Sequence, residues 1–140
     1  MRRLVWRGWF KFVTRIELTI SSEYGIMFVH DAGGKYIIPE GAGQTSVTHT
    51  DTCVAFEVLS HVDGEAKVII DHEIRAGDSG EHVFSGKVRC ASKSLALSDH
   101  TAHQFASVPL EDEYADVTIM MSEQPNPDVV ICLVKNIETY

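Results

Sequence analysis

Two groups of histidine and carboxylate residues in this chain have the side-chain types that bind a metal ion. Asp99 and His100 are followed by His103, and the segment 71–73 places His72 between two acids. Imidazole nitrogens and carboxylate oxygens are common ligands of zinc and of other transition metals. The spacing of these histidines is less specific than a His-Glu-x-x-His motif, in which two imidazoles share one helix face. The pattern does not decide whether His72, His100 or His103 bind metal, and we predict no cofactor.

The segment 77–80, Gly-Asp-Ser-Gly, resembles the sequence around the nucleophile of chymotrypsin-like serine proteases. Such a serine needs a histidine base, an aspartate behind that base, and backbone amides that form an oxyanion hole. The candidates for the other two members are His30 or His49 as the base, and Asp51 or Asp63 behind it.

The residues after Ser79 do not continue this protease motif. The family continues with Gly-Gly-Pro after the serine, whereas in this chain Gly80 is followed by Glu81 and His82. A chain of 140 residues is also too short for two six-stranded barrels. Since Gly, Asp and Ser are the usual residues of surface turns, a hydrolase that uses Ser79 is the least favoured of our functional hypotheses.

The acidic residues form two groups along the sequence, which we select as candidate partner-binding residues. The first group is Asp63, Glu65, Asp71 and Glu73, and the second is Glu111, Asp112, Glu113 and Asp116. Such residues most often serve only to solvate a surface. An acidic surface can also dock on a basic active site, such as that of a nuclease. Complementary charge then speeds encounter and excludes nucleic acid from the same groove.

The net charge of −8 is unevenly distributed. Residues 1–15 contain five basic residues and no acid, so the rest of the chain contains the other seven basic residues and all 20 acidic ones. An acidic body of this kind is not suited to bind a phosphate backbone. We therefore expect no direct nucleic-acid binding and a basic protein as the partner.

The first residues resemble a secretory signal only in their positive charge. Arg7 and Lys11 interrupt any apolar stretch, and no run in the chain approaches the ~18 apolar residues of a membrane span. Three widely spaced cysteines without a Cys-x-x-Cys pair favour reduced thiols. We therefore expect a cytoplasmic protein with residues 1–12 as a basic aromatic lead, either an edge strand or disordered, and residues 13–140 as one domain.

The dominant pattern along the chain is an alternation of apolar and polar residues, which is typical of half-buried strands. We expect about eight strands and little or no helix, near residues 16–20, 24–30, 52–58, 66–72, 83–90, 94–97, 114–121 and 129–137. Within the last strand Val129, Ile131 and Leu133 share one side. The pattern predicts an all-β fold, a two-sheet antiparallel sandwich.

The segments between the predicted strands contain residues that indicate turns and loops. Asp63-Gly64 is typical of a hairpin turn, and we expect it to join the strands on either side of it. Residues 33–44 are expected to form a long loop or a crossover between sheets. No segment has a convincing helical period, and one or two helical turns are considered only for residues 101–107. The oligomeric state is not indicated by the sequence.

Four segments resemble the ComJ-type family of small bacterial β proteins, whose founding member is a competence-associated nuclease inhibitor. They are residues 16–28, 53–59, 94–97 and 108–121. The segment 108–114, Val-Pro-Leu-Glu-Asp-Glu-Tyr, is similar to the family's Leu-Pro-x-Gly-x-Tyr lead into a strand, but it has Glu111-Asp-Glu where the family tends to have Gly. The basic N-terminus also lies outside the family pattern. The resemblance implies a β-sandwich and a non-enzymatic inhibitor or immunity-type protein, and it transfers no functional residue.

The composition, the acidic groups and the resemblance together favour a non-enzymatic protein-binding module, with an acidic nuclease inhibitor or immunity-type protein as its specific form. The alternative is a small-molecule binding sandwich, with a ligand held between its sheets or under the loop of residues 33–44. A hydrolase that uses Ser79 ranks third.

Overall fold

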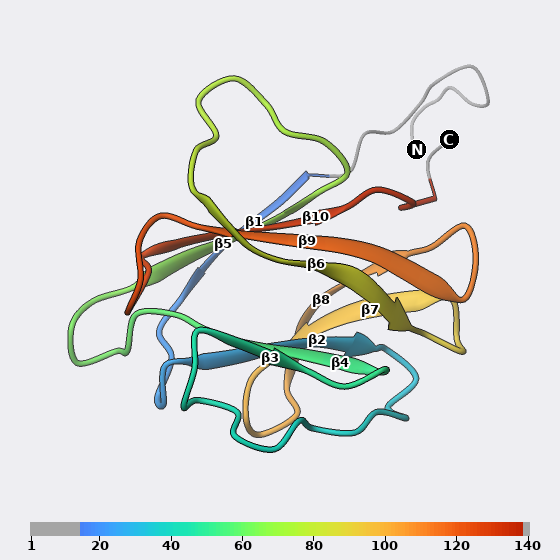
Figure 1. Cartoon of the computed structure of the whole chain (residues 1–140), viewed down its shortest axis with the longest axis horizontal. Helices are drawn as coiled ribbons and strands as arrows, with labels where there is room; N and C mark the ends of the chain where they lie inside the picture. Colours follow the sequence, from blue (N-terminus) through green and yellow to red (C-terminus); the bar gives the residue numbers. More distant parts are fainter. Residues whose placement is uncertain (1–14, 139–140) are drawn as a thin grey trace.

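The protein forms two five-stranded sheets that pack face to face, and the computed structural model describes residues 15–138 (Figure 1). The strands of the first sheet are, in spatial order, β1 (Arg15–Ile20), β5 (Ala66–Asp71), β10 (Val129–Val134), β9 (Tyr114–Met121) and β6 (Glu81–Arg89). Those of the second sheet are β3 (Val47–His49), β4 (Cys53–Glu57), β2 (Ile26–Asp31), β7 (Ser94–Ser98) and β8 (Gln104–Pro109). The predicted all-β sandwich is confirmed. Residues 1–12, for which we expect an edge strand or disorder, lie outside the described residues.

Two short strands, β3 and β8, were not expected from the alternation. The prediction of helical turns within residues 101–107 is wrong, because Gln104–Pro109 pairs with β7 as the edge strand of the second sheet. The first two residues of β8, Gln104 and Phe105, are both exposed, which hides the period of two. Edge strands bury little of their surface and therefore leave a weak pattern.

The alternation in the first sheet sorts its residues correctly onto two faces. In β10, Val130, Cys132 and Val134 are fully buried between the sheets. Val129, Ile131 and Leu133 alternate with them and belong to a smaller apolar cluster on the outer face of this sheet. Each large apolar side chain moved out of water contributes about 1.5–3 kcal/mol to folding, so the inner face is the main source of stability.

Two long loops bear on the outer faces of the sheets. The loop of residues 72–80 rises over the outer face of the first sheet (Figure 1). The loop of residues 32–46 contributes Tyr36 and Ala42 to an apolar cluster with Phe28 and Cys53 on the second sheet. The expected long loop at residues 33–44 is confirmed. It connects β2 to β3 within one sheet and does not cross between sheets.

The expected hairpin at Asp63-Gly64 is wrong. The strands on either side of this segment, β4 and β5, belong to different sheets, so residues 58–65 carry the chain from the second sheet to the first. Gly64 has a φ of 137°, which a residue with a Cβ rarely adopts. Asp-Gly therefore marks a sharp turn here, but the turn lies between layers.

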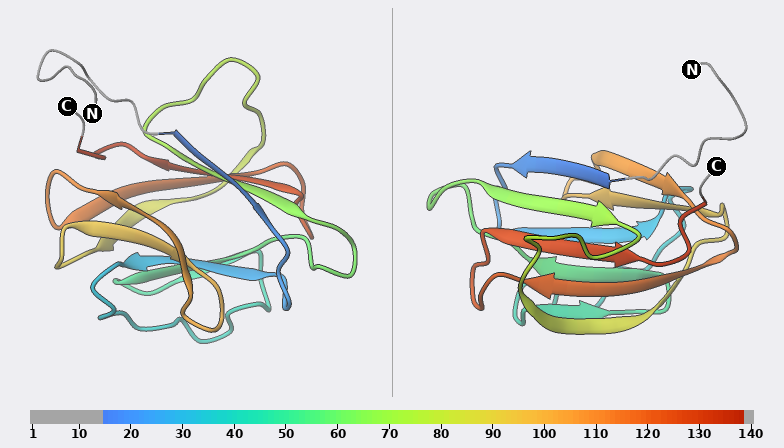
Figure 2. Two further views of the ribbon diagram at one scale, coloured as in Figure 1. Left: turned by 180° about the vertical axis from the view of Figure 1, so that it is seen from behind. Right: turned by 90° about the horizontal axis from the view of Figure 1, so that it is seen from above.

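The first sheet contains one parallel pair, β5 with β10, among antiparallel neighbours. The second sheet is antiparallel throughout. Figure 2 shows that the strands of both sheets run along one general direction, so the turns collect at two ends of the sandwich. Among the described residues, no helix has the length and hydropathy that crossing a bilayer requires.

Candidate functional site

At one end of the sandwich, four connections carry acids. This end comprises the turn after β1, the segment 58–65, the turn after β7, the turn after β9 and the strand residues next to them. We call it the acidic end. Its carboxylates are Glu23, Glu57, Asp63, Glu65, Glu81, Asp99, Glu123 and Asp128. All are exposed or half-buried.

Hydrogen bonds between the turns hold the acidic end together. The amide of Leu59 donates to the carbonyl of Pro127 at 2.8 Å, and the amide of Lys67 donates to that of Asp128 at the same distance. The amide of His61 donates to the carbonyl of Ser22 at 2.7 Å. Main-chain hydrogen bonds thus link three of these connections, and the contact of Tyr24 with His100 joins the turn after β7 to them.

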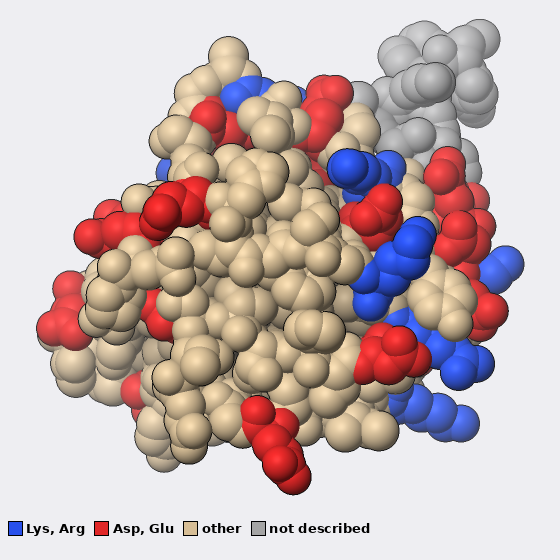
Figure 3. Space-filling view, viewed as in Figure 1, with Lys and Arg blue, Asp and Glu red and all other residues tan. Residues whose placement is uncertain are grey.

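Basic residues are concentrated away from the acidic end. Within residues 15–138, Lys67 is the one lysine or arginine in these turns and the strand residues beside them. The opposite end holds Lys35, Lys87, Arg89, Lys93 and Lys135. In Figure 3, the visible basic side chains lie mostly on the right, among acidic ones, whereas acidic side chains dominate the left margin. The acidic end is therefore strongly negative, whereas acids and bases are mixed at the opposite end.

The acidic end also exposes apolar and aromatic side chains. Tyr24 is 68% exposed and Val62 is 75% exposed. Tyr24 packs edge-on against His100, with ring centroids 4.4 Å apart, and Phe105 packs against His103 at 4.7 Å. Aromatic anchors within a polar rim are the usual composition of a protein interface. This end therefore has both parts of a docking surface.

The predicted acidic residues fall into three places. Asp63 and Glu65 are exposed members of the acidic end, whereas Glu73 lies in the loop of residues 72–80. Glu111, Asp112, Glu113 and Asp116 lie at the opposite end, where Cys90 donates its amide to the carbonyl of Glu113. The guanidinium of Arg89 approaches the Glu113 carboxylate to 4.0 Å. The two predicted groups therefore do not form one surface.

Asp71 has a structural position that removes it from the surface. Its side chain is 0% exposed and accepts hydrogen bonds from Arg15 Nη1 at 2.7 Å and Arg75 Nε at 2.6 Å. Burial alone would raise the pKa of this carboxyl, but hydrogen bonds from Arg75, Arg15 and the amide of His72 hold it below its usual value. The carboxylate is thus fully engaged within the protein and is not free to meet a partner.

Asp78 completes this ion cluster from the loop of residues 72–80. The carboxylate of Asp78 accepts from Arg15 Nη2 at 2.8 Å and from the amide of Arg75 at 2.8 Å. The hydrogen bond from Arg15 lowers the pKa of Asp78, and the same contact raises the pKa of Arg15 above its already high value. The cluster fastens the loop to the edge strand β1.

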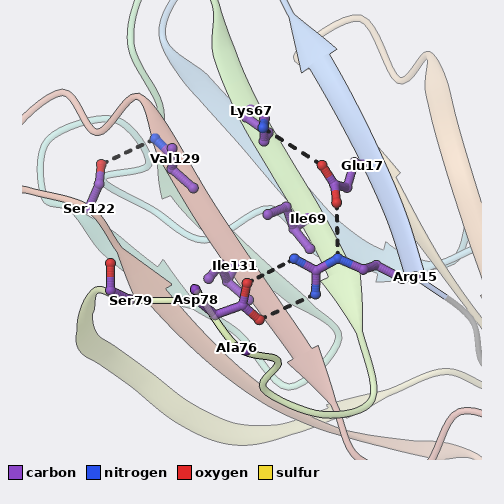
Figure 4. Close-up of a pocket in the computed structure, with 11 residues that line it drawn as sticks. Arg15, Glu17, Lys67, Ile69, Ala76, Asp78, Ser79, Ser122, Val129 and Ile131 are labelled. Atoms are coloured by element: carbon purple, nitrogen blue, oxygen red, sulfur yellow. Dashed lines mark hydrogen bonds and ion pairs between the residues drawn. The ribbon is translucent and has the colours of Figure 1, made fainter.

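A depression of about 340 Å³ lies between this loop and the first sheet (Figure 4). Its floor is formed by Ile69, Val129 and Ile131, from the outer apolar cluster. The rim is polar and consists of Arg15, Glu17, Lys67, Asp78, Ser79 and Ser122. Sequence analysis missed this pocket because its rim comes from four separate segments.

The structure does not bring the proposed protease triad together. Ser79 is exposed in the loop over the first sheet. His30 lies in the second sheet, where its Nε2 is 2.7 Å from the hydroxyl of Ser98, and His49 packs against Phe84. A serine without a histidine base within reach is not an activated nucleophile.

His30 occupies a buried polar site that sequence analysis did not identify. Its Nδ1 lies 2.7 Å from the carbonyl of Asp31, and its ring stacks on Tyr36 at 3.7 Å. A carbonyl only accepts, so Nδ1 carries the proton and Nε2 accepts from Ser98. Burial lowers the pKa of His30. The imidazole is therefore neutral and serves to fasten the loop of residues 32–46.

Each of the candidate metal-binding histidines has another neighbour. His72 is next to Asp71, His100 is 3.6 Å from a carboxylate oxygen of Glu23, and His103 packs against Phe105. Within the part of the chain that the structure describes, no three His, Cys, Asp or Glu side chains are placed to hold one metal ion.

Comparison with solved structures finds this fold in ComJ from Bacillus subtilis, an inhibitor of the DNA-degrading activity of NucA. The TM-score is 0.62 over 90% of this chain and 99% of ComJ, with 10% sequence identity. A second structure, the product of crocagin biosynthetic gene J, gives a TM-score of 0.48 and 14% identity over 90% and 99% of the two chains. No family model matches the chain, and neither does a curated protein. The likeness to ComJ shows a shared fold.

Proposed function

We propose that this protein is a non-enzymatic inhibitor that docks its acidic end on the basic substrate-binding surface of a nuclease. The observation that carries the proposal is the segregation of charge, with eight carboxylates and a single lysine at one end of the described chain. The fold shared with ComJ, which inhibits a nuclease, supports the same class of function.

Electrostatics explains how such an inhibitor acts. A nuclease presents Lys and Arg side chains to the phosphates of its substrate, and an acidic surface is attracted to the same groove. Opposite charge raises the association rate, particularly at low salt. Tyr24 and Val62 then provide apolar contact that persists at higher salt. The nuclease is blocked because its groove is occupied.

The test is an assay of DNA degradation by each basic nuclease of the same genome, purified and mixed with this protein. We expect one enzyme to be inhibited, with the affinity falling at least about tenfold between about 50 mM and about 300 mM salt. The double variant Asp63→Lys/Glu65→Lys should weaken that inhibition by about tenfold or more, since both residues belong to the acidic end.

The matched control carries the same charge change at the other end. Glu111→Lys/Glu113→Lys should leave inhibition within about twofold, because these residues lie at the opposite end, where Arg89 already approaches Glu113. Failure of every basic nuclease to be inhibited would overturn the proposed function. Loss of inhibition in the control alone would place the docking surface at the opposite end and contradict our assignment.

The alternative, a small-molecule binding sandwich, has one supporting observation. The depression beside Asp78 has a volume at the lower limit of ordinary ligand pockets and combines an apolar floor with polar side chains. This depression, however, lies beside the acidic end.

A further inference from the structure

We infer that the pocket formed by β1, β5, β10 and residues 76–79 receives an apolar side chain of a partner, flanked in that partner by Lys or Arg. This inference rests on the proposed function and deepens it. The acidic end supplies the attraction for the cations, and the pocket supplies an anchor for the apolar residue between them.

The floor of the pocket is apolar. Ile69, Val129 and Ile131 lie on the outer face of the sheet, where a strand usually shows polar residues to solvent. The loop of residues 72–80 does not fill the space above them, so a depression of about 340 Å³ remains. A side chain that enters it exchanges water for apolar contact on the floor.

The charges on the rim of the pocket are already paired. Arg15 donates to Glu17 at 3.0 Å and to Asp78 at 2.8 Å, and Lys67 lies 3.7 Å from Glu17. Figure 4 shows these side chains directed at one another around the opening. Since the rim presents paired charges, the group that enters gains little from carrying a charge of its own.

The rim of the pocket is continuous with the acidic end. Ser122 on the rim donates its hydroxyl to Asp128 at 2.9 Å, and the amide of Val129 donates to that hydroxyl at 3.2 Å. Gln124 in the same turn reaches Glu81 at 3.5 Å. The pocket therefore opens beside carboxylates of the acidic end. Charge complementarity selects cations on either side of the apolar residue.

The experiment uses two synthetic peptides, Lys-Arg-Phe-Arg-Lys and Lys-Arg-Ser-Arg-Lys, titrated into protein labelled with ¹³C at isoleucine methyl groups. We expect the Phe peptide to shift the methyl signals of Ile69 and Ile131 and to bind about tenfold more tightly than the Ser peptide. Equal affinities, or unchanged signals of these two methyl groups, would overturn the pocket assignment.

Two variants give the matched comparison. Ser79→Trp fills the pocket from an exposed rim position and should bring the ratio of the two affinities to about one. Ser107→Trp places the same ring on β8 of the other sheet and should leave the ratio unchanged. The dispersion of the isoleucine methyl signals reports whether each variant is folded. A ratio that persists in folded Ser79→Trp contradicts the inference.

Failure of the inference and failure of the proposed function give different results. Asp63→Lys/Glu65→Lys should weaken both peptides equally and preserve their ratio, because it acts on the cations alone. Binding of both peptides that depends on these acids but not on phenylalanine retains the acidic docking surface and rejects the pocket. Affinity of free N-acetylphenylalaninamide equal to that of the Phe peptide would reject the partner and indicate a small-molecule site.

Discussion

Arg15, the first described residue of β1, contacts the carboxylate of Asp78 through two guanidinium nitrogens, although the two residues are 63 positions apart in the sequence. Nη2 donates to one carboxylate oxygen of Asp78 at 2.8 Å, and Nη1 lies 3.3 Å from the other. The same Nη1 donates to the buried Asp71 at 2.7 Å. One guanidinium therefore joins the edge strand, the end of β5 and the loop that forms the roof of the pocket.

Replacing Asp71 by Asn should destabilise the protein by about 3–5 kcal/mol. The variant leaves the cations of Arg15 and Arg75 beside a neutral group where a fully buried charge was paired. Urea unfolding at pH 7 measures the change. Glu73→Gln, an exposed change in the same loop, is the control and should stay within about 0.5 kcal/mol. Equal, small effects of both variants would contradict the role of the cluster.

The same cluster predicts an acid-side pH dependence. The pKa values of Asp71 and Asp78 are lowered in the folded state. Their stabilisation is therefore complete above the unfolded value of about 3.9 and is lost as the pH falls through it toward the folded values. The free energy of unfolding of the native protein should fall more steeply below about pH 4 than that of Asp71→Asn.

Substituting Gly80 by Ala should cost more stability than the same change at Gly77, in the same loop. Both have positive φ, +151° for Gly80 and +91° for Gly77. A Cβ at Gly80 would lie 2.8 Å from the carbonyl oxygen of Met121, whereas one at Gly77 meets nothing within 4 Å. We expect about 1 kcal/mol for Gly77→Ala and at least about 2 kcal/mol for Gly80→Ala. Thermal unfolding compares them, and equal costs would disprove the clash.

The neutral His30 predicts a loss of stability in mild acid. Its pKa is lowered by burial, so the unfolded chain takes up a proton on this residue below about pH 6.5 while the folded protein does not. His30→Phe/Ser98→Ala removes both polar partners together and should flatten the fall between pH 7.5 and 5.5 by up to about 1.4 kcal/mol per pH unit. Urea unfolding at both pH values provides the measurement. Identical pH profiles would show that the pKa of His30 is not lowered in the folded state.

The three cysteines should be unreactive in the native protein. Cys53, Cys90 and Cys132 are free and buried, and burial raises the pKa of each thiol to about 12. A thiol-disulfide reagent at pH 8 should modify all three in denaturant, but in the native protein only at the much slower rate of opening. Rapid modification of one thiol in the folded state would show a local opening that this packing does not predict.

The sequence pattern predicted the side of a strand on which each residue lies better than it predicted which strands pair with one another. In β10, the alternation separated Val130 and its inward companions from Ile131 correctly, because burial on one side acts on each residue locally. The turn at Asp63-Gly64 was assigned to a hairpin because turn chemistry does not encode which sheet the next strand joins. That choice depends on the packing of the whole sandwich.

The candidate site was predictable only in part for the same reason. Asp63 and Glu65 were selected, whereas Glu23, Glu123 and Asp128 were not, since only the strand order shows that their turns lie at the same end of the sandwich. The group at residues 111–113 looked equivalent until the structure placed Arg89 and Lys93 beside it. Adjacent carboxylates in a sequence do not reveal the cations that the fold brings to them.

The position of β10 between β5 and β9 bears on how the chain matures during synthesis. β10 pairs in parallel with β5, made some 60 residues earlier, and antiparallel with β9. Until residues 129–134 leave the ribosome, the edge pair β1–β5 has no connection to the pair β6–β9. The emerging chain therefore carries two unjoined half-sheets with open edges. Pairing of β10 with both neighbours joins the two half-sheets and covers these open edges.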